Sequence, residues 1–153
     1  MAKNNGYILA ILAGVLALIS VLTPIVYQDA FTYSVYIWVW TLYYTKEEIS
    51  GATDIDFYTE NSDMVIWGLI TTLIIVIAMV ILLTTGAKAK HSSNNAGAWF
   101  LARLMLIATP IVFYVSFTEI EAFGGLFWDL FDPHFGFYGP IIAGISAMIA
   151  AFV

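Results

Sequence analysis

Four long apolar stretches, separated by polar segments, set the pattern of this chain. The clearest covers residues 64–84, MVIWGLITTLIIVIAMVILLT, which contains no charge and no proline. A helix of this length, rising about 1.5 Å per residue, measures roughly 30 Å, the thickness of a bilayer's hydrocarbon core. Similar stretches cover residues 7–26, 98–117 and 137–153. The pattern therefore predicts four membrane-spanning helices.

The polar connections between these stretches are of two kinds. Residues 27–63 and 118–136 are acidic and aromatic, whereas residues 85–97 are polar and basic. In the first connection, period-two alternation over residues 31–45 predicts a β-strand, and residues 54–59 can form a return strand. A lone hairpin is marginally stable, so we expect it to lie on the helix ends or to join a larger sheet. The predicted fold class is all-α membrane: one domain, residues 1–153, with an up-down four-helix bundle and a small extracellular β-hairpin or sheet.

Composition and charge support a membrane location and give the chain a direction. Of 153 residues, 61% are hydrophobic and 10% are charged, whereas a soluble domain has about a quarter charged. The acidic residues all lie within residues 29–63 and 119–132, while Lys3, Lys88, Lys90 and Arg103 lie elsewhere. Cytoplasmic loops collect Lys and Arg. We therefore expect a multi-pass protein of the cell membrane with both termini cytoplasmic and both acidic loops outside.

Candidate chemistry is sparse. Asp54, Asp56 and Glu60 form a carboxylate cluster of the kind that binds Ca²⁺, but its spacing is not that of an EF-hand, and a solvated loop face explains it as well. His134 is interpreted as a turn residue after proline rather than a metal or pH-sensitive site.

The classes of protein that the sequence excludes follow from missing features. No Asp or Glu lies within the predicted helices, and no nucleophile–base pattern, P-loop or HExxH occurs. The chain has no cysteine, so disulfides and thiolate metal sites are excluded. We therefore predict no enzyme, catalytic residue, cofactor or metal. The acidic balance excludes nucleic acid as a partner.

Contact surfaces are predicted instead. The aromatic content of the outer loops exceeds what membrane anchoring requires, and exposed aromatic strands are typical of protein interfaces. The last helix has small residues at the four-residue spacing that suits close helix packing. The predicted interaction residues are Tyr36, Trp38, Trp40, Tyr43 and Trp128, and the predicted helix-packing residues are Gly139, Ala143, Ala147 and Ala151.

The predicted architecture, with four spans, both ends inside, a long first outer loop with strands and a short second one, together with two short segments, carries a resemblance to a known family. Residues 128–133, WDLFDP, followed by Gly139-Pro140, resemble the claudin pattern of an Asp-Phe-Tyr-Asn-Pro run before the fourth helix. Residues 38–43, WVWTLY, lie where claudins carry Gly-Leu-Trp, although the paired cysteines of that loop are absent. The chain thus resembles the claudin and peripheral myelin protein superfamily. The resemblance implies an extracellular sheet on a four-helix bundle, lateral self-association, and a barrier or adhesion role.

These observations favour a non-enzymatic scaffold or interaction protein of the lipid bilayer. It would self-associate into a homo-oligomer, or contact other membrane subunits, through its aromatic outer loop. One alternative is an accessory subunit of a larger membrane enzyme or transport complex. Another is an oligomeric cation channel whose acidic outer loops attract cations.

Overall fold

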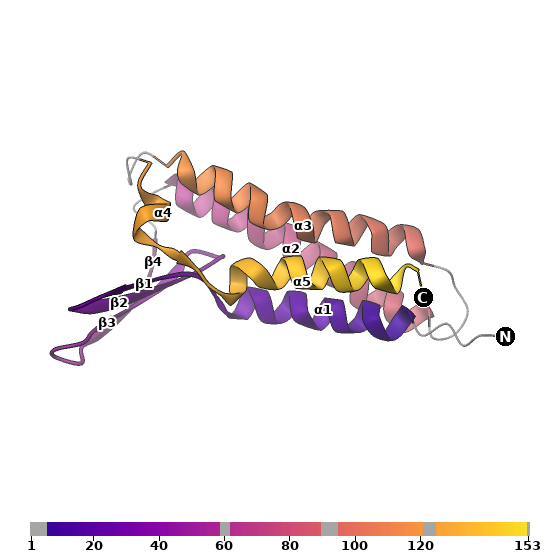
Figure 1. Cartoon of the computed structure of the whole chain (residues 1–153), viewed down its shortest axis with the longest axis horizontal. Coiled ribbons are helices and arrows are strands. Elements are labelled where there is room, and N and C mark those ends of the chain that lie inside the picture. The colour runs from indigo at the N-terminus through magenta and orange to yellow at the C-terminus, as the bar shows by residue number, and fades with distance from the viewer. Residues whose placement is uncertain (1–5, 59–61, 90–94, 121–124, 153) are drawn as a thin grey trace.

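Helices run side by side and a β-sheet extends from one end of them (Figure 1). The computed structural model describes residues 6–58, 62–89, 95–120 and 125–152. The start of the first helix and the end of the last lie at the opposite end of the bundle from the sheet (Figure 1). The helices are α1 (Gly6–Leu22), α2 (Ser62–Ala89), α3 (Ala96–Thr118), α4 (Phe127–Leu130) and α5 (Phe135–Ala150).

The sheet is antiparallel and is built from both predicted outer loops. Its strand order is β4-β3-β2-β1-β5. The edge strand β5 pairs only through Val26 with Pro133 and Tyr27 with Asp132. The strands are β1 (Pro24–Ala30), β2 (Tyr33–Trp38), β3 (Leu42–Glu47), β4 (Thr53–Phe57) and β5 (Asp132–Pro133).

The predicted fold class is wrong. The described residues form five helices and a five-stranded antiparallel sheet, not an all-α bundle with a hairpin. Among them, only α2 and α3 are long and apolar enough to cross a membrane, since α1 and α5 have 17 and 16 residues. The first helix was expected to reach residue 26, but it ends at Leu22 and β1 begins at Pro24. Proline has no N–H and its ring clashes with the preceding helical turn, so the chain leaves the helix there.

The single strand predicted over residues 31–45 is two strands joined by a tight turn. The Thr41 N–H donates to the Trp38 carbonyl at 2.9 Å, and Thr41 has a positive φ of 69°. Val39 and Thr41 are buried in this turn. The turn fits against α2 because Gly68 has no side chain: a Cβ there would lie 2.7 Å from the Val39 carbonyl oxygen and would clash with the Thr41 methyl group. Burial of the turn overrides the alternating pattern.

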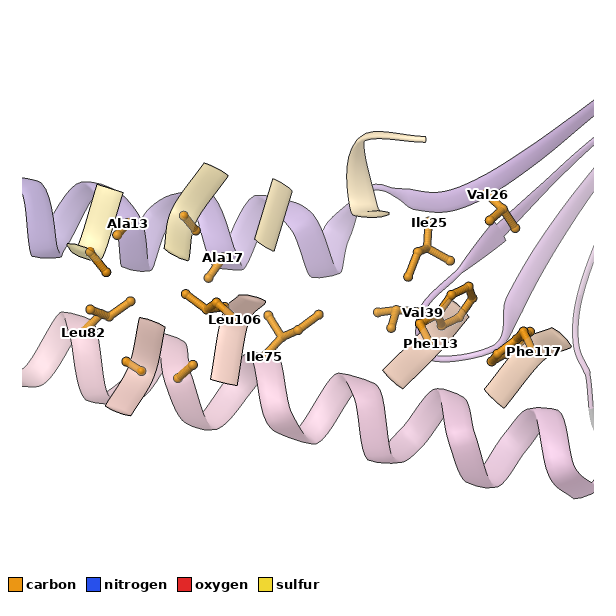
Figure 2. Close-up of a cluster of buried hydrophobic side chains, with 14 of the residues drawn as sticks. Ala13, Ala17, Ile25, Val26, Val39, Ile75, Leu82, Leu106, Phe113 and Phe117 are labelled. Carbon is orange, nitrogen blue, oxygen red and sulfur yellow. The ribbon is translucent and has the colours of Figure 1, made fainter. Parts of the chain in front are cut away.

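The core changes in character along the molecule. Within the bundle, Ala13 and Ala17 of α1 face larger side chains such as Leu82 of α2 and Leu106 of α3 (Figure 2). Near the sheet the core contains the aromatic rings of Phe113 and Phe117 beside Ile25, Val26 and Val39 (Figure 2). The sheet is thus fixed to the bundle through a continuous apolar core.

Candidate interaction surface

Trp38 and Trp40 attach the sheet to the end of α1. The Trp38 indole N–H donates to the Leu22 carbonyl at 2.9 Å, and that of Trp40 donates to the Val21 carbonyl at 3.0 Å. The last carbonyls of a helix have no partner within the helix, so these two bonds satisfy acceptors that would otherwise need water. Both tryptophans were singled out from the sequence as contact residues. The structure shows their indole nitrogens engaged within the chain.

A row of aromatic rings crosses the sheet. Tyr27, Tyr36 and Tyr44 are cross-strand neighbours on β1, β2 and β3, and we refer to them as the tyrosine ladder. Their ring centroids lie 6.3 Å apart for Tyr27 and Tyr36, and 6.2 Å apart for Tyr36 and Tyr44. The His134 ring meets the first two edge-on, at 5.7 and 6.4 Å. Such aromatic pairs stabilise neighbouring strands, so the ladder stiffens the sheet.

His134 connects the sheet to α5. Its backbone N–H donates to the Ile25 carbonyl at 2.8 Å, and it is the residue that precedes the first turn of α5. Its Nδ1 atom is buried and has no hydrogen-bond partner among the described residues. No three His, Asp or Glu side chains within the described ranges are arranged to hold a metal ion. His134 thus occupies a structural junction, packed by aromatic rings.

The free end of the sheet, which we call the sheet tip, combines two turns: the one between β1 and β2 and the one between β3 and β4. The Glu48 N–H donates to the Thr32 carbonyl at 2.9 Å and joins them. Two apolar side chains project there, Phe31 at 97% exposure and Ile49 at 77%. Side chains of this kind are well placed to bury apolar area against another molecule.

Carboxylates surround a buried hydroxyl beside the tip. Ser34 is only 8% exposed, and its Oγ lies 3.1 Å from Asp29 Oδ1 and 3.2 Å from Glu48 Oε1. The Lys46 ammonium lies 3.0 Å from the Glu48 carboxylate. This hydrogen-bonded ion pair raises the pKa of Lys46 and lowers the pKa of Glu48. Lys46 is the only basic residue in the five strands, so acidic charge dominates the sheet.

The strand β4 is the most exposed element of the sheet. All five of its residues are exposed, and no described strand pairs with its outer edge. Asp54 and Asp56 lie on the same face of the sheet and pair with Thr45 and Tyr43 of β3, respectively. Glu60, the third member of the predicted carboxylate cluster, lies outside the described residues.

The other predicted contact residues lie closer to the bundle. Tyr43 is partly buried, with its ring 4.8 Å from that of Tyr58. Burial raises the pKa of the Tyr58 hydroxyl, and neighbouring Tyr43 contributes to the same effect. Trp128 stacks on Tyr114 at 4.7 Å, and its indole N–H lies 3.0 Å from Thr118 Oγ1. Tyr43 therefore packs within the sheet region, and Trp128 joins α4 to α3.

Three of the predicted helix-packing residues lie in α5, and the fourth, Ala151, directly follows it. Gly139, Ala143 and Ala147 are buried, and Ala151 is partly buried. A Cβ placed on Gly139 would clash with the Ser20 hydroxyl of α1, which shows how closely the two helices approach. Small residues are also buried on α1: Ala10, Ala13, Gly14, Ala17 and Ser20. Of these, Ser20 lies at the contact with Gly139, whereas a Cβ on Gly14 would meet Leu83 of α2.

Several residues that shape this surface did not stand out in the sequence. Gly68 and Gly136 each allow a close backbone approach between elements far apart in the chain. The tyrosine ladder depends on strand register, although the nine- and eight-residue spacing of its members is compatible with successive hairpins. The chain matches no family model and no curated protein. The resemblance to claudins stays a prediction.

Proposed function

We propose that this chain is a non-enzymatic membrane protein that presents an acidic β-sheet to protein partners outside the bilayer. Support for a membrane location comes from α2 and α3. Only 28% of the most apolar segment of α2, and 39% of that of α3, is buried inside the protein. A core helix of a soluble protein would be mostly buried. Large apolar side chains instead cover the outside of α2, among them Ile66, Leu69, Leu73 and Val80. Lipid is the solvent that suits such a surface.

Charge sorting supports an orientation. Lys88 lies in the last turn of α2, and Arg103 lies in the first part of α3, where its guanidinium is 4.2 Å from the Phe100 ring centre. Both lie toward the end of the bundle away from the sheet, where basic residues mark the cytoplasmic side. In this orientation the carboxylate-rich sheet lies outside the cell. The start of α1 and the end of α5 lie on the cytoplasmic side.

The observation that carries the proposal is the sheet itself. It extends away from the bundle (Figure 1), and the side chains at its tip and along β4 are exposed. A sheet that served only to cover the helix ends would not need strands that project with Phe31 and Ile49 exposed. Among the described residues, no three His, Asp or Glu side chains are grouped to hold a metal ion. Contact with other proteins is the role that this geometry suits.

Orientation is testable by single cysteines, because the native chain contains none. In intact cells, a membrane-impermeant maleimide should label Ile49→Cys at the sheet tip. It should label Lys88→Cys only after the membrane is permeabilised. Reaction of Lys88→Cys in intact cells, with Ile49→Cys protected, would overturn the orientation.

The interaction role is tested by purification from native membranes in a mild detergent. We expect the chain to elute with other proteins at a fixed stoichiometry, or as a defined oligomer. An Ile49→Ser, Phe31→Ser variant should insert normally but lose part of this assembly, because it lacks the apolar side chains of the tip. A wild-type chain that elutes as a monomer without partners would contradict the proposal.

A further inference from the structure

We propose that the open edge of β4 binds an extended segment of another protein that carries basic residues at alternate positions. This inference rests on the proposed function and names the kind of partner and the strand that receives it. No described strand pairs with the outer edge of β4, and all of its residues, Thr53–Phe57, are exposed. The strand carries aspartates at alternate positions, 54 and 56. Addition of a strand to such an edge is a common mode of peptide recognition.

Hydrogen bonding decides which backbone groups of β4 are available. The Glu47 N–H donates to the Ala52 carbonyl at 2.8 Å, and the Tyr58 N–H donates to the Thr41 carbonyl at 3.0 Å. In an antiparallel pair, residues that exchange bonds alternate with residues that do not. Given the register of β3 and β4, the backbone N–H and C=O groups of residues 54 and 56 point toward β3. The backbone groups of residues 53, 55 and 57 point toward the open edge. The Phe57 N–H is occupied by the Asp56 carboxylate at 2.7 Å. The Thr53 and Ile55 backbone groups remain for an added strand.

The side chains select the charge of that strand. Asp54 and Asp56 occupy the positions at which an added antiparallel strand forms its closer, non-hydrogen-bonded pairs. Opposite charges at directly facing positions stabilise such pairs, and like charges destabilise them. A segment with basic residues two positions apart would therefore meet both carboxylates. An apolar residue between them would lie beside Ile55 on the other face of the sheet.

A second copy of this chain is a poor occupant of the edge. We consider antiparallel pairing of β4 with the β4 of a second copy. Three registers pair at least three residues and place the outward-pointing backbone groups of the two strands opposite each other. Centred on Ile55, the pairing places Asp54 opposite Asp56 twice; centred on Asp54 or on Asp56, it places that residue opposite itself. Every register thus brings carboxylates together, which is a recognised device against edge-to-edge self-association.

The chain cannot supply the basic segment itself. Two basic residues separated by one residue occur only at Lys88 and Lys90. Lys88 lies in the last turn of the 28-residue helix α2, whereas β4 lies near the start of that helix. We therefore assign the edge to a segment of a different protein. A partner with a basic, extended segment outside the membrane satisfies both the hydrogen bonding and the charge of β4.

The test uses the full chain in lipid nanodiscs and a fluorescein-labelled peptide with the core Lys-Val-Lys-Val-Lys. Fluorescence anisotropy should show saturable binding, and the matched Glu-Val-Glu-Val-Glu peptide should not bind. The Asp54→Asn, Asp56→Asn variant should bind roughly five- to tenfold more weakly, as expected for two cross-strand charge pairs. The control variant Asp129→Asn, Asp132→Asn loses the same charge away from β4 and should bind within about twofold of wild type. Equal losses in the two variants would show unspecific attraction and overturn the inference.

A second pair of variants tests the backbone. Ile55→Pro removes an N–H that faces the open edge and leaves the bonds to β3 intact, as edge strands tolerate. It should abolish peptide binding, while Ile55→Thr should retain it. Unchanged peptide binding by Ile55→Pro would overturn strand addition. Binding of the acidic peptide would overturn the inference as well. So would self-association of the wild-type chain, if Ile55→Pro abolished that self-association. If native partners copurify equally with wild type and all β4 variants, this inference fails and the proposed function stands. Absence of any partner or oligomer is the failure of the proposed function.

Discussion

Replacement of Gly136 by alanine should destabilise the junction between the sheet and the bundle. Gly136 lies in the first turn of α5, against the segment that connects α1 to β1. A Cβ at this position would lie 2.6 Å from the Pro24 carbonyl oxygen, 2.8 Å from that of Thr23 and 2.9 Å from the Ile25 Cα. Real Cβ atoms essentially never approach within 3.0 Å, and all three neighbours are backbone atoms that cannot rotate away.

The magnitude follows from two opposing effects. Overpacking of a tightly packed site costs about 1–3 kcal/mol. Alanine has a better helix propensity than glycine and returns up to about 1 kcal/mol. We therefore expect Gly136→Ala to lose about 1–2 kcal/mol in free energy of unfolding, which lowers Tm by roughly 4 °C in a chain of this size.

The assay is thermal unfolding in detergent, followed by far-UV circular dichroism, with Gly97→Ala as the matched control. Gly97 also lies in the first turn of a helix, α3, but a Cβ there would meet nothing within 4 Å. The control should therefore keep or slightly raise the Tm, because only the helix propensity changes. If both variants unfold at the wild-type temperature or above, the close approach at Gly136 does not exist and the described junction is wrong.

Two further predictions concern the sheet. Trp40→Phe keeps an aromatic ring but removes the five-membered ring of the indole with the N–H that bonds to the Val21 carbonyl. It should cost at least about 1 kcal/mol of unfolding free energy in the same melting assay, since packing is lost together with the hydrogen bond; an unchanged Tm would show that this bond does not stabilise the protein. A carboxyl NMR titration should show the pKa of Glu48 below its ordinary value of 4.5, because Lys46 bonds to the ionised form. The ion pair then contributes stability above pH 4.5 and loses it as the pH falls through the lowered pKa. Lys46→Met should return the Glu48 pKa to its ordinary range, and no change would exclude the pair in solution.

The sequence predicted the positions of the apolar helices better than their ends. The centres of α2 and α3 are evident from uninterrupted apolar runs, and the structure extends both beyond the predicted bounds. The end of α1 was placed four residues too late because an apolar run does not distinguish a helix from the buried strand that follows it. Pro24 was the available signal, and it marks the first residue of β1 rather than the last turn of a helix.

The sheet was only partly predictable. Alternation indicated strands in the first outer loop, but the turn at Thr41 depends on burial against Gly68, a contact between residues 27 positions apart. The fifth strand comes from the second loop, and two residues give no periodic signal. Among candidate contact residues, Trp38 and Trp40 were recognised for their size and type. Their bonds to α1 could not be foreseen, because they depend on where α1 ends.

The short connections between helices and strands have a mechanical consequence. Only Thr23 separates α1 from β1, and only His134 separates β5 from α5, so neither junction contains a slack linker. The indole bonds of Trp38 and Trp40 restrain the same corner. The sheet therefore cannot swing independently of the helices: in a bilayer of different thickness, where helices adjust by tilting, its tip would sweep through the same angle. In the proposed orientation, lipid composition would in this way set the height of the acidic strands above the bilayer surface.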